Sequence, residues 1–492
     1  MSTTSFLSRR EFAAKSALGL LGLGAVSLPA FAAGPAGTAP GNAAARGIWK
    51  INRNPKALEA PPDAPAGETW RYMLAYPFQV APNLAAAHVN MKMCGGPGQD
   101  FEGGTDIILF DQLGELRPDR ALKVSRNRFE PNPNNDNRPA VIAMYPGLLG
   151  FVPFGAKRAD GRPHPHAGTG FVLISGSAWP LDRSEGYATY PDRIGLTTYG
   201  GTKAYQPSYL YQLSYDGTNF RIGSPKVLQD TEIIAGHRCG MTGMSSAIAD
   251  GDDLLATMCA RKPGGGANSG IQRWRRVNGT WIPGDYEAVT PDDDSIEPSL
   301  VRDLDGSLLF LARGRRKMGP PLRVWRQAKP GAVWELRINV NGLLNSTPIT
   351  LNRAVDGTPY VASNFYQPEF KLPAGLYSDG GISRLEPVGW RGERSTICVW
   401  ALNEARDGFD AQFVARDPRS EFGLPPHGTV WAVDHPTASP VRLADGQWHS
   451  LMGYRMLEWK ENTHFILPPS PQTGCYIDEI VSFGPPAPLW NF

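Results

Sequence analysis

Short turns built on an Asp-Gly or Asn-Gly pair recur along this chain and limit the folds open to it. A pair of this kind supplies the positive φ that tight hairpin turns require. Such pairs stand at Asp160-Gly161, Asp216-Gly217, Asp250-Gly251, Asn278-Gly279, Asp305-Gly306, Asn341-Gly342, Asp356-Gly357 and Asp379-Gly380. Runs of apolar and β-branched residues flank them, so we expect antiparallel hairpins that follow one another along the chain.

The rest of the sequence also favours β structure. The 55 glycines and 45 prolines are spread over the whole chain, and after residue 33 no run of about a dozen residues has the apolar period of a helix. Hairpins in series without helices indicate a sandwich, a barrel or a propeller. A four-stranded propeller blade takes roughly 40 to 60 residues, and the turn pairs fall at about half that interval. We therefore predict an all-β fold, a six- or seven-bladed β-propeller of four-stranded antiparallel blades.

The first residues have the order of an export signal. Ser8-Arg9-Arg10-Glu11-Phe12 precedes a Leu/Gly/Ala-rich run over 17–28, and Pro29-Ala30-Phe31-Ala32 offers the small residues that a signal peptidase needs. The apolar run of roughly a dozen residues is too short to span a bilayer, which takes about 20. The paired arginines match the twin-arginine signal, so we expect export by that pathway to the periplasm or the cell exterior.

The predicted organisation has three parts. Residues 1–33 form the twin-arginine signal peptide, the Ala/Gly/Pro-rich residues 34–46 form a disordered linker, and residues 47–492 form a single β-propeller domain. No later run approaches the length of a membrane span, so we expect no stable membrane insertion. The formal net charge of +2 comes from mixed signs and gives no basic field for nucleic acid. We expect a monomer without a nucleic-acid partner.

One stretch carries a family resemblance. From Glu297 to Arg313 the chain reads Glu-Pro-Ser-Leu-Val-Arg-Asp-Leu-Asp-Gly-Ser-Leu-Leu-Phe-Leu-Ala-Arg. This resembles the sialidase-like (BNR-repeat) β-propellers, in which a Glu and the Arg that ends the next strand are active-site groups. Ser214-Tyr-Asp216-Gly217-Thr-Asn-Phe220 is similar to a shortened Asp-box turn of that superfamily. The resemblance implies a glycoside hydrolase in which arginines bind a substrate carboxylate and the Glu takes a proton from a Tyr nucleophile.

Hairpin geometry also brings Glu297 and Arg313 together. They open and close two strands joined at Asp305-Gly306, so both lie at the end of the hairpin away from the turn. The alternative is a plain cross-strand ion pair, worth under about 1 kcal/mol if it is exposed. The resemblance further implies Arg384 and Arg71 as the other arginines that bind the substrate carboxylate, and Asp100 as the acid.

A second resemblance points to a lyase. Thr189-Tyr190-Pro191 and the Tyr-rich strand around Tyr209 resemble the middle blade of propeller-type polysaccharide lyases such as ulvan lyases. Those enzymes remove the proton α to a uronate carboxylate. This resemblance implies Tyr190 and His166 as catalytic residues, while Gln206 stands where an Arg is expected. A third alternative is a non-catalytic propeller that binds glycans. In all three cases the partner is a poly- or oligosaccharide.

His237, Cys239 and Cys259 lie on either side of the Asp250-Gly251 hairpin, which places Cys259 opposite about residues 241–243. Three interpretations stay open: a structural zinc site with a fourth ligand from elsewhere, a disulfide formed after export, or two buried thiols. In a propeller His237 can equally face the central channel and contact substrate as an acid/base group. We expect no cofactor to be required for activity.

Overall fold

The computed structural model describes most of the chain after residue 48. The described residues are 49–492 apart from 65–68, 95–102, 127, 133–137, 145–146, 181–206, 229, 235–237, 262–265, 291–294, 315–321, 341–347, 365–393 and 461–464. The predicted signal peptide and linker lie outside them. Residues 47–492 form one compact unit.

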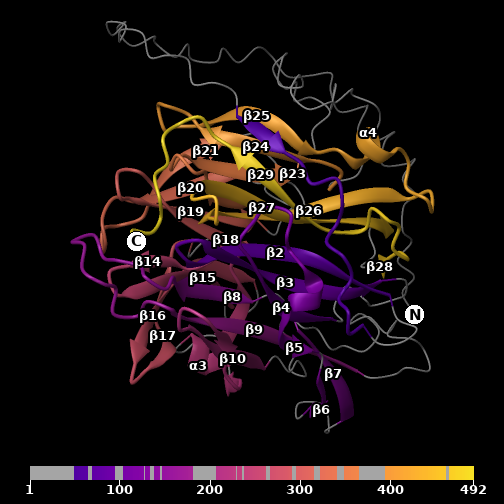
Figure 1. Ribbon diagram of the computed structural model, residues 1–492, viewed down its shortest axis with the longest axis horizontal. Helices are drawn as coiled ribbons and strands as arrows, with labels where there is room; N and C mark the ends of the chain where they lie inside the picture. The colour runs from indigo at the N-terminus through magenta and orange to yellow at the C-terminus, as the bar shows by residue number, and fades with distance from the viewer. Residues whose placement is uncertain are drawn as a thin grey trace, which may run out of the picture. The chain divides into compact units, whose positions relative to one another are not determined.

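The described residues fold into six antiparallel sheets, so the all-β prediction is confirmed and the blade number is six (Figure 1). Helical structure among them is limited to η2 (Pro118–Arg120), α3 (Asp230–Ile233) and α4 (Pro418–Phe422). Within the described part of the chain, none of the helices has the length and apolar character that a membrane-spanning helix needs.

Each sheet is one blade, and its strands follow one another outward from the centre. Blade 1 contains β2 (Thr69–Ala81), β3 (Leu84–Cys94), β4 (Gly103–Phe110) and β5 (Leu122–Arg126). Blade 2 contains β8 (Leu148–Val152), β9 (Thr169–Pro180), β10 (Ser208–Tyr215) and β11 (Phe220–Ile222), together with β6 (Arg128–Asn132), β7 (Arg138–Met144) and β12 (Lys226–Leu228). Blade 3 contains β13 (Arg238–Thr242), β14 (Ile248–Asp250), β15 (Asp253–Arg261), β16 (Ala267–Val277) and β17 (Thr280–Ala288).

The second half of the chain repeats this plan. Blade 4 contains β18 (Ser295–Arg302), β19 (Leu308–Gly314), β20 (Leu322–Gln327) and β21 (Glu335–Val340). Blade 5 contains β22 (Thr350–Arg353), β23 (Pro359–Asn364), β24 (Ile397–Leu402) and β25 (Phe409–Arg416). Blade 6 contains β26 (Val430–Arg442), β27 (Trp448–Lys460), β28 (Phe465–Ile466), β29 (Gly474–Val481) and, from the other end of the chain, β1 (Lys50–Asn52).

The turns at Asp216-Gly217, Asp250-Gly251, Asn278-Gly279, Asp305-Gly306 and Asp356-Gly357 connect strands as predicted, whereas Asn341-Gly342 and Asp379-Gly380 lie outside the described residues. In the turn between β18 and β19 the glycine takes the positive φ. Gly306 has a φ of 84°, and its N–H donates to the carbonyl of Asp303 at 3.0 Å. Oδ1 of Asp305 accepts the N–H of Ser307 at 2.9 Å. The Asp thus caps the backbone two residues on, which is why this residue type suits the position. The same Asp contact recurs at Asp216, Asp356 and Asp445.

Hydrogen bonds between the inner edges of consecutive blades close the sheets into a ring. From blade 1 onward, the donor and acceptor pairs are Phe154 N–H to Val80 O (2.8 Å), Ala247 N–H to Leu149 O (2.7 Å), Leu300 N–H to Ser245 Oγ (3.2 Å), Leu351 N–H to Ser299 Oγ (2.8 Å), Ala438 N–H to Asn352 Oδ1 (2.9 Å) and Arg442 N–H to Gln79 Oε1 (2.6 Å). The last pair joins blade 6 back to blade 1.

The apolar core is divided among the six interfaces between neighbouring blades. Between blades 2 and 3, for example, the ring of Phe171 stacks on Trp274 at a centroid distance of 4.0 Å. Because burial of apolar surface supplies most of the stabilisation of a fold, each blade depends on both of its neighbours. The innermost strands then surround the axis of the ring, where the polar groups described below meet.

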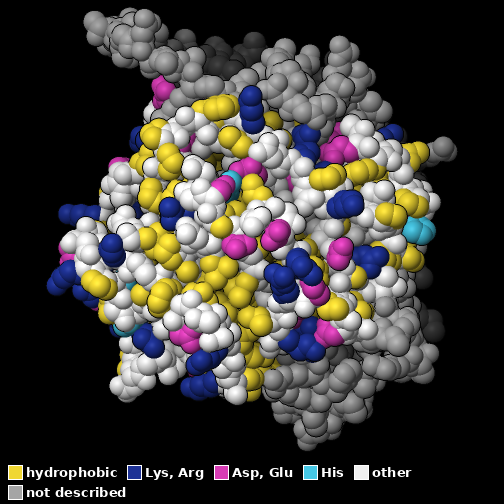
Figure 2. All heavy atoms as spheres, in the orientation of Figure 1, with side chains coloured by type: hydrophobic (Ala, Val, Ile, Leu, Met, Phe, Trp, Pro, Cys, Tyr) yellow, Lys and Arg dark blue, Asp and Glu magenta, His cyan; other side chains and the backbone are white. Residues whose placement is uncertain are grey.

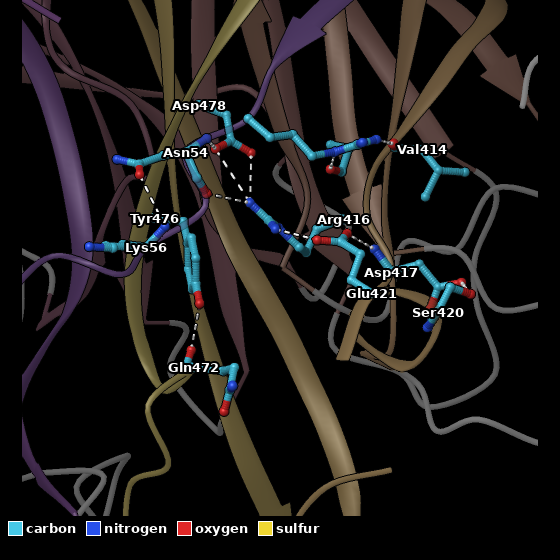
Figure 3. Close-up of polar contacts among 12 residues, drawn as sticks. Asn54, Lys56, Val414, Arg416, Asp417, Ser420, Glu421, Gln472, Tyr476 and Asp478 are labelled. Carbon is cyan, nitrogen blue, oxygen red and sulfur yellow. Dashed lines mark hydrogen bonds and ion pairs between the residues drawn. The ribbon is translucent and has the colours of Figure 1, made fainter. Parts of the chain in front are cut away.

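The N-terminal strand β1 completes the last blade. It pairs with β29 in an antiparallel register, with Ile51 opposite Ile480, and Figure 1 shows the indigo strand beside the yellow one. Next to this pairing, the buried Arg416 donates to the carbonyl of Asn54 at 3.2 Å and to Asp478 at 3.3 Å, and it forms an ion pair with Glu421 (Figure 3). The first and the last strand of the described residues therefore belong to the same blade.

Candidate functional site

Glu297 and Arg313 meet as the sequence predicts. Nη1 of Arg313 donates to Oε2 of Glu297 at 2.8 Å. The side chain of Glu297 is 5% exposed and that of Arg313 is 15% exposed, so the ion pair is buried. Glu297 lies near the start of β18, the innermost strand of blade 4, and Arg313 lies near the end of β19.

A β-bulge in β18 sets the backbone conformation at Glu297. Three steps along β18, from Ile296 to Ser299, face two steps along β19, from Arg313 to Leu311, which is the geometry of a β-bulge. Pro298 within the bulge has no N–H to contribute to the ladder. Glu297 itself has a φ of 52°, in the left-handed region that is costly for a residue with a Cβ.

The same device occurs in the innermost strand of blade 6. Three steps along β26, from Asp434 to Thr437, face two steps along β27, from Arg455 to Gly453. His435 precedes Pro436, as Glu297 precedes Pro298, and has a φ of 54°. Nε2 of His435 lies 4.0 Å from Oε1 of Glu297. Two separate blades therefore use a bulge to bring an ionisable side chain to the same place.

Asp434 anchors the blade 6 side of the cluster. Its fully buried carboxylate accepts from His435 Nδ1 at 2.8 Å and from Arg455 Nη2 at 3.1 Å. It also forms an ion pair of 2.5 Å with Nη1 of Arg394, which precedes β24 of blade 5. Glu297, Arg313, Arg394, Asp434, His435 and Arg455 form what we call the central cluster.

The charges of the central cluster fix the protonation of its carboxyl groups. Burial raises the pKa of Glu297, but the positive charges of Arg313, His435 and Arg394 outweigh burial and hold this pKa below the ordinary value of 4.5. The pKa of Asp434 also lies well below its ordinary value, because Arg455, His435 and Arg394 outweigh burial there. Both carboxyl groups are therefore ionised at neutral pH.

Tyr76, on the innermost strand of blade 1, is close enough to Glu297 and Arg455 to interact with their charges. Burial, followed by the negative charge of Glu297, raises the pKa of its hydroxyl, so the hydroxyl is protonated at neutral pH. The Tyr76 hydroxyl donates a hydrogen bond to Sδ of Met244 at 3.8 Å. Its ring also lies 6.1 Å from that of His88, on the neighbouring strand β3. His88 is fully buried, and burial lowers its pKa to about 4.

No protein-family model matches the sequence, and no curated protein does. Similar solved structures exist. They include sialidases and an arabinanase.

Three of these structures have low sequence identity to this chain. A protein of unknown function from Dyadobacter fermentans is 13% identical with a TM-score of 0.49, and the match covers 89% of this chain and 99% of that one. The NanB sialidase of Streptococcus pneumoniae is 10% identical with a TM-score of 0.48, covering 88% and 70%. The α-L-arabinanase of Penicillium chrysogenum is 10% identical with a TM-score of 0.45, covering 88% and 98%. The propeller assignment above depends on the sheet topology and not on these likenesses.

Two other predicted site residues make their described contacts with groups outside the central cluster. Arg71, on β2, is half-buried and donates to the carbonyl of Trp70 at 2.9 Å; no contact among the described residues joins it to Glu297. His166 follows β8, and its ring lies 5.4 Å from that of Trp281. Its neighbour His164 contacts the carbonyl of Gly251, in a turn at the end of the propeller away from Glu297. The structure does not bring His166 to the cluster.

The remaining predicted residues have few or no described contacts. Arg384, Asp100, Tyr190 and His237 lie outside the described residues, and their roles stay predictions. Cys239 pairs with Ala260 in the ladder between β13 and β15, and Cys259 is buried with its Sγ 3.5 Å from Oγ of Ser269. Among the described residues no group of three or more His, Cys, Asp or Glu side chains is placed to hold a metal ion. The choice between zinc, disulfide and thiols stays open.

Sequence reasoning missed Tyr76, Arg394, Asp434, His435 and Arg455. One signal for His435 was present in the sequence: Glu297-Pro298-Ser299 and His435-Pro436-Thr437 share the pattern of an ionisable residue, Pro and a small hydroxyl residue. In both places the proline carbonyl accepts a hydrogen bond from a threonine hydroxyl of the neighbouring blade. Thr257 donates to Pro298 at 3.0 Å, and Thr350 donates to Pro436 at 2.5 Å. Nothing comparable marks the two arginines.

Proposed function

We propose that this protein is an exported β-propeller enzyme that hydrolyses glycosides of acidic sugars. The observation that carries the proposal is the buried pair of Glu297 and Arg313 at the axis of the ring, beside Tyr76. A buried ion pair costs desolvation energy that a hydrophobic pair avoids. A charged pair that is kept in the interior despite this cost is typical of groups that act on a substrate.

The arginines suit an acidic sugar. Arg313, Arg394 and Arg455 bring three guanidinium groups into the central cluster from blades 4, 5 and 6. A guanidinium group binds a carboxylate through two parallel hydrogen bonds and keeps its charge at any working pH. A sugar carboxylate bound here holds the anomeric carbon near the axis of the ring.

Glu297 and Tyr76 supply the nucleophile. In the proposed reaction the Tyr76 oxygen attacks the anomeric carbon while Glu297, which is ionised, accepts the phenolic proton. The bond to the leaving sugar breaks, and that sugar departs as an alcohol after it receives a proton. Water then displaces Tyr76 from the anomeric carbon, and the phenolate recovers its proton from Glu297.

A lyase is the second candidate, and one contact favours it. His435 is held by Asp434 beside three arginines, an arrangement that fits removal of a proton α to a uronate carboxylate. The two reactions give different products. Hydrolysis releases a new reducing end without an ultraviolet chromophore, whereas elimination creates a conjugated double bond that absorbs in the ultraviolet.

A substrate screen read in both ways tests the proposal. Purified protein is incubated with 3′-sialyllactose, ulvan and polyglucuronate, and new reducing ends and ultraviolet absorbance are followed together. We expect new reducing ends without new ultraviolet absorbance from at least one substrate, and a loss of roughly 100-fold or more in Glu297→Gln. The exposed Glu115→Gln is the matched control and should keep full activity. New ultraviolet absorbance would support the lyase. No product from any substrate would support the third alternative, a propeller that binds glycans without cleaving them.

A further inference from the structure

We propose that His435 is the acid/base residue of this site, which protonates the departing glycosidic oxygen and later accepts a proton from the attacking water. This inference rests on the proposed hydrolase function and names the group that the reaction above leaves unassigned. It departs from the expectation that Asp100 is the acid.

The contact with Asp434 gives His435 a defined orientation. Nδ1 of the imidazole lies 2.8 Å from Oδ1 of Asp434, so Nδ1 carries a hydrogen that it donates to the carboxylate. Nε2 is then the nitrogen that exchanges a proton, and it faces the central cluster 4.0 Å from Glu297. A base held by a buried carboxylate is the arrangement that proton-transfer sites require.

The backbone at His435 is held in a costly conformation. Among the described residues, the non-glycine positions with positive φ are Asn278, Glu297, Arg406 and His435. Asn278 and Arg406 lie in turns, where a positive φ is common, whereas Glu297 and His435 lie inside strands. Such conformations cost of order 1–3 kcal/mol each and cluster at functional sites. The same strain at both residues points to the same use.

Charged side chains from four strands and one loop surround the His435 imidazole and determine its pKa. Asp434 lies on its own strand and Glu297 on β18, and both negative charges favour the imidazolium form. Burial and the positive charge of Arg455, on β27, favour the neutral imidazole. Arg394, in the loop before β24, forms an ion pair with Asp434, and Arg313, on β19, forms one with Glu297. Burial is the largest of these effects, and the pKa of His435 lies below the ordinary 6.5.

The proton balance of the two-step reaction closes with His435 in this role. In the first step the imidazolium gives its Nε2 proton to the leaving oxygen while Glu297 takes the proton of Tyr76. In the second step water adds its oxygen to the anomeric carbon and gives one proton to His435, while Tyr76 recovers its proton from Glu297. One water is consumed for each glycosidic bond that breaks, and every side chain returns to its starting state.

The dependence of activity on pH follows from these states. Glu297 must be ionised and His435 protonated when substrate binds. Because the pKa of Glu297 lies below 4.5 and that of His435 lies below 6.5, kcat/KM should be greatest on the acid side of 6.5. It should fall at higher pH as His435 loses its proton.

Two leaving groups distinguish an acid from a merely structural residue. The full chain and His435→Asn are assayed on 3′-sialyllactose, whose sugar alcohol needs protonation, and on the p-nitrophenyl sialoside, whose phenolate does not. Asn is chosen because it tolerates positive φ better than most residues. If the screen identifies a uronide, the corresponding disaccharide and p-nitrophenyl uronide replace this pair. The control is His449→Gln, a buried histidine between two carboxylates at the turn end of β27.

The expected result is a selective loss. His435→Asn should lose roughly 100-fold or more in kcat/KM on the sugar leaving group, lose much less on p-nitrophenol, and no longer show the decline at high pH. The control should match the wild type on both substrates. Equal losses on both leaving groups, or none, would overturn the role of His435 and leave the hydrolase proposal standing. A wild type that cleaves neither substrate class would remove the hydrolase proposal, and this inference with it.

Discussion

At the level of single residues, the charges of the central cluster can be buried because they balance one another. Glu297 is held by Arg313, and Asp434 is held by Arg394, Arg455 and His435. In such a set each charge is stable only while its partner is present, because an uncompensated charge in the interior is costly. Removing an arginine should therefore lower the free energy of unfolding more than removing the arginine together with the carboxylate that it pairs with.

This difference gives a prediction for Arg313. Replacement by Met leaves the carboxylate of Glu297 buried without its direct partner, and we expect a loss of about 3–5 kcal/mol in the free energy of unfolding. Urea denaturation measures it. Adding Glu297→Gln to the same chain should restore part of the loss, because the buried charge is then absent. Arg221→Met, which disrupts an exposed ion pair with Asp216, should leave the unfolding midpoint unchanged. If Arg313→Met behaved like Arg221→Met, the pair would not be buried as described.

At the scale of elements, blade 6 joins the two ends of the chain. Strand β1 contributes Asn52, whose side chain donates to Glu479 on β29 at 2.6 Å, and Arg416 of blade 5 binds Asn54 and Asp478 beside it (Figure 3). On β27, His449 lies between Glu479 at 2.6 Å and Asp445 at 3.0 Å. The edge of the blade is thus held by a chain of polar contacts that includes a titrating group.

His449 makes the stability of this blade depend on pH. Burial lowers its pKa, but the carboxylates of Glu479 and Asp445 outweigh burial and raise this pKa above 6.5. The contribution of a group with a raised pKa is complete below its unfolded value and is lost as pH rises through the folded value. The pKa of Glu479 is lowered from 4.5, so its contribution is lost as pH falls. The pair should stabilise most between about 4.5 and 6.5.

The measurement is the thermal unfolding midpoint as a function of pH for the wild type and for His449→Gln. The difference between the two proteins should be largest between these pKa values and should shrink as pH rises above 6.5. A difference that is constant across this range would show that the histidine contributes by packing alone.

At the scale of the whole molecule, six blades depend on one closure. Each interface between blades has its own apolar cluster and at least one hydrogen bond, and the final hydrogen bond from Arg442 to Gln79 links the last blade to the first. The face drawn in Figure 2 mixes basic and acidic side chains without a large area of one sign. The mixture of signs on that face agrees with a formal net charge of +2.

Removal of β1 tests how much the outer strand of blade 6 stabilises the molecule. A chain that begins at residue 55 lacks β1 and the Asn54 contact of Arg416, and its unpaired β29 becomes a sheet edge. We expect its unfolding temperature to fall by several degrees relative to a chain that begins at Gly47. Calorimetry on the two proteins compares them directly. Equal unfolding temperatures would mean that β1 adds nothing to the ring.

The sequence indicated the local features of this fold and not the distant ones. The turn at Asp305-Gly306 and the meeting of Glu297 with Arg313 follow from a single hairpin, so residue spacing was enough to predict them. The pairing of β1 with β29 joins opposite ends of the chain, and no local pattern encodes it. His435 comes within 4.0 Å of Glu297 only because blades 4 and 6 face one axis. Such contacts depend on the curvature of the ring, which residue spacing does not specify.

In the proposed reaction Tyr76, Glu297 and His435 act together on the anomeric carbon of an acidic sugar. Covalent trapping tests it most directly: the protein is incubated with the fluorinated, slowly hydrolysed derivative of the sugar that the screen identifies, and its peptides are analysed by mass spectrometry. We predict one sugar attached to the peptide that contains Tyr76, and none in Tyr76→Phe. Turnover of the substrate with the label on another residue, or with no label at all, would contradict the account.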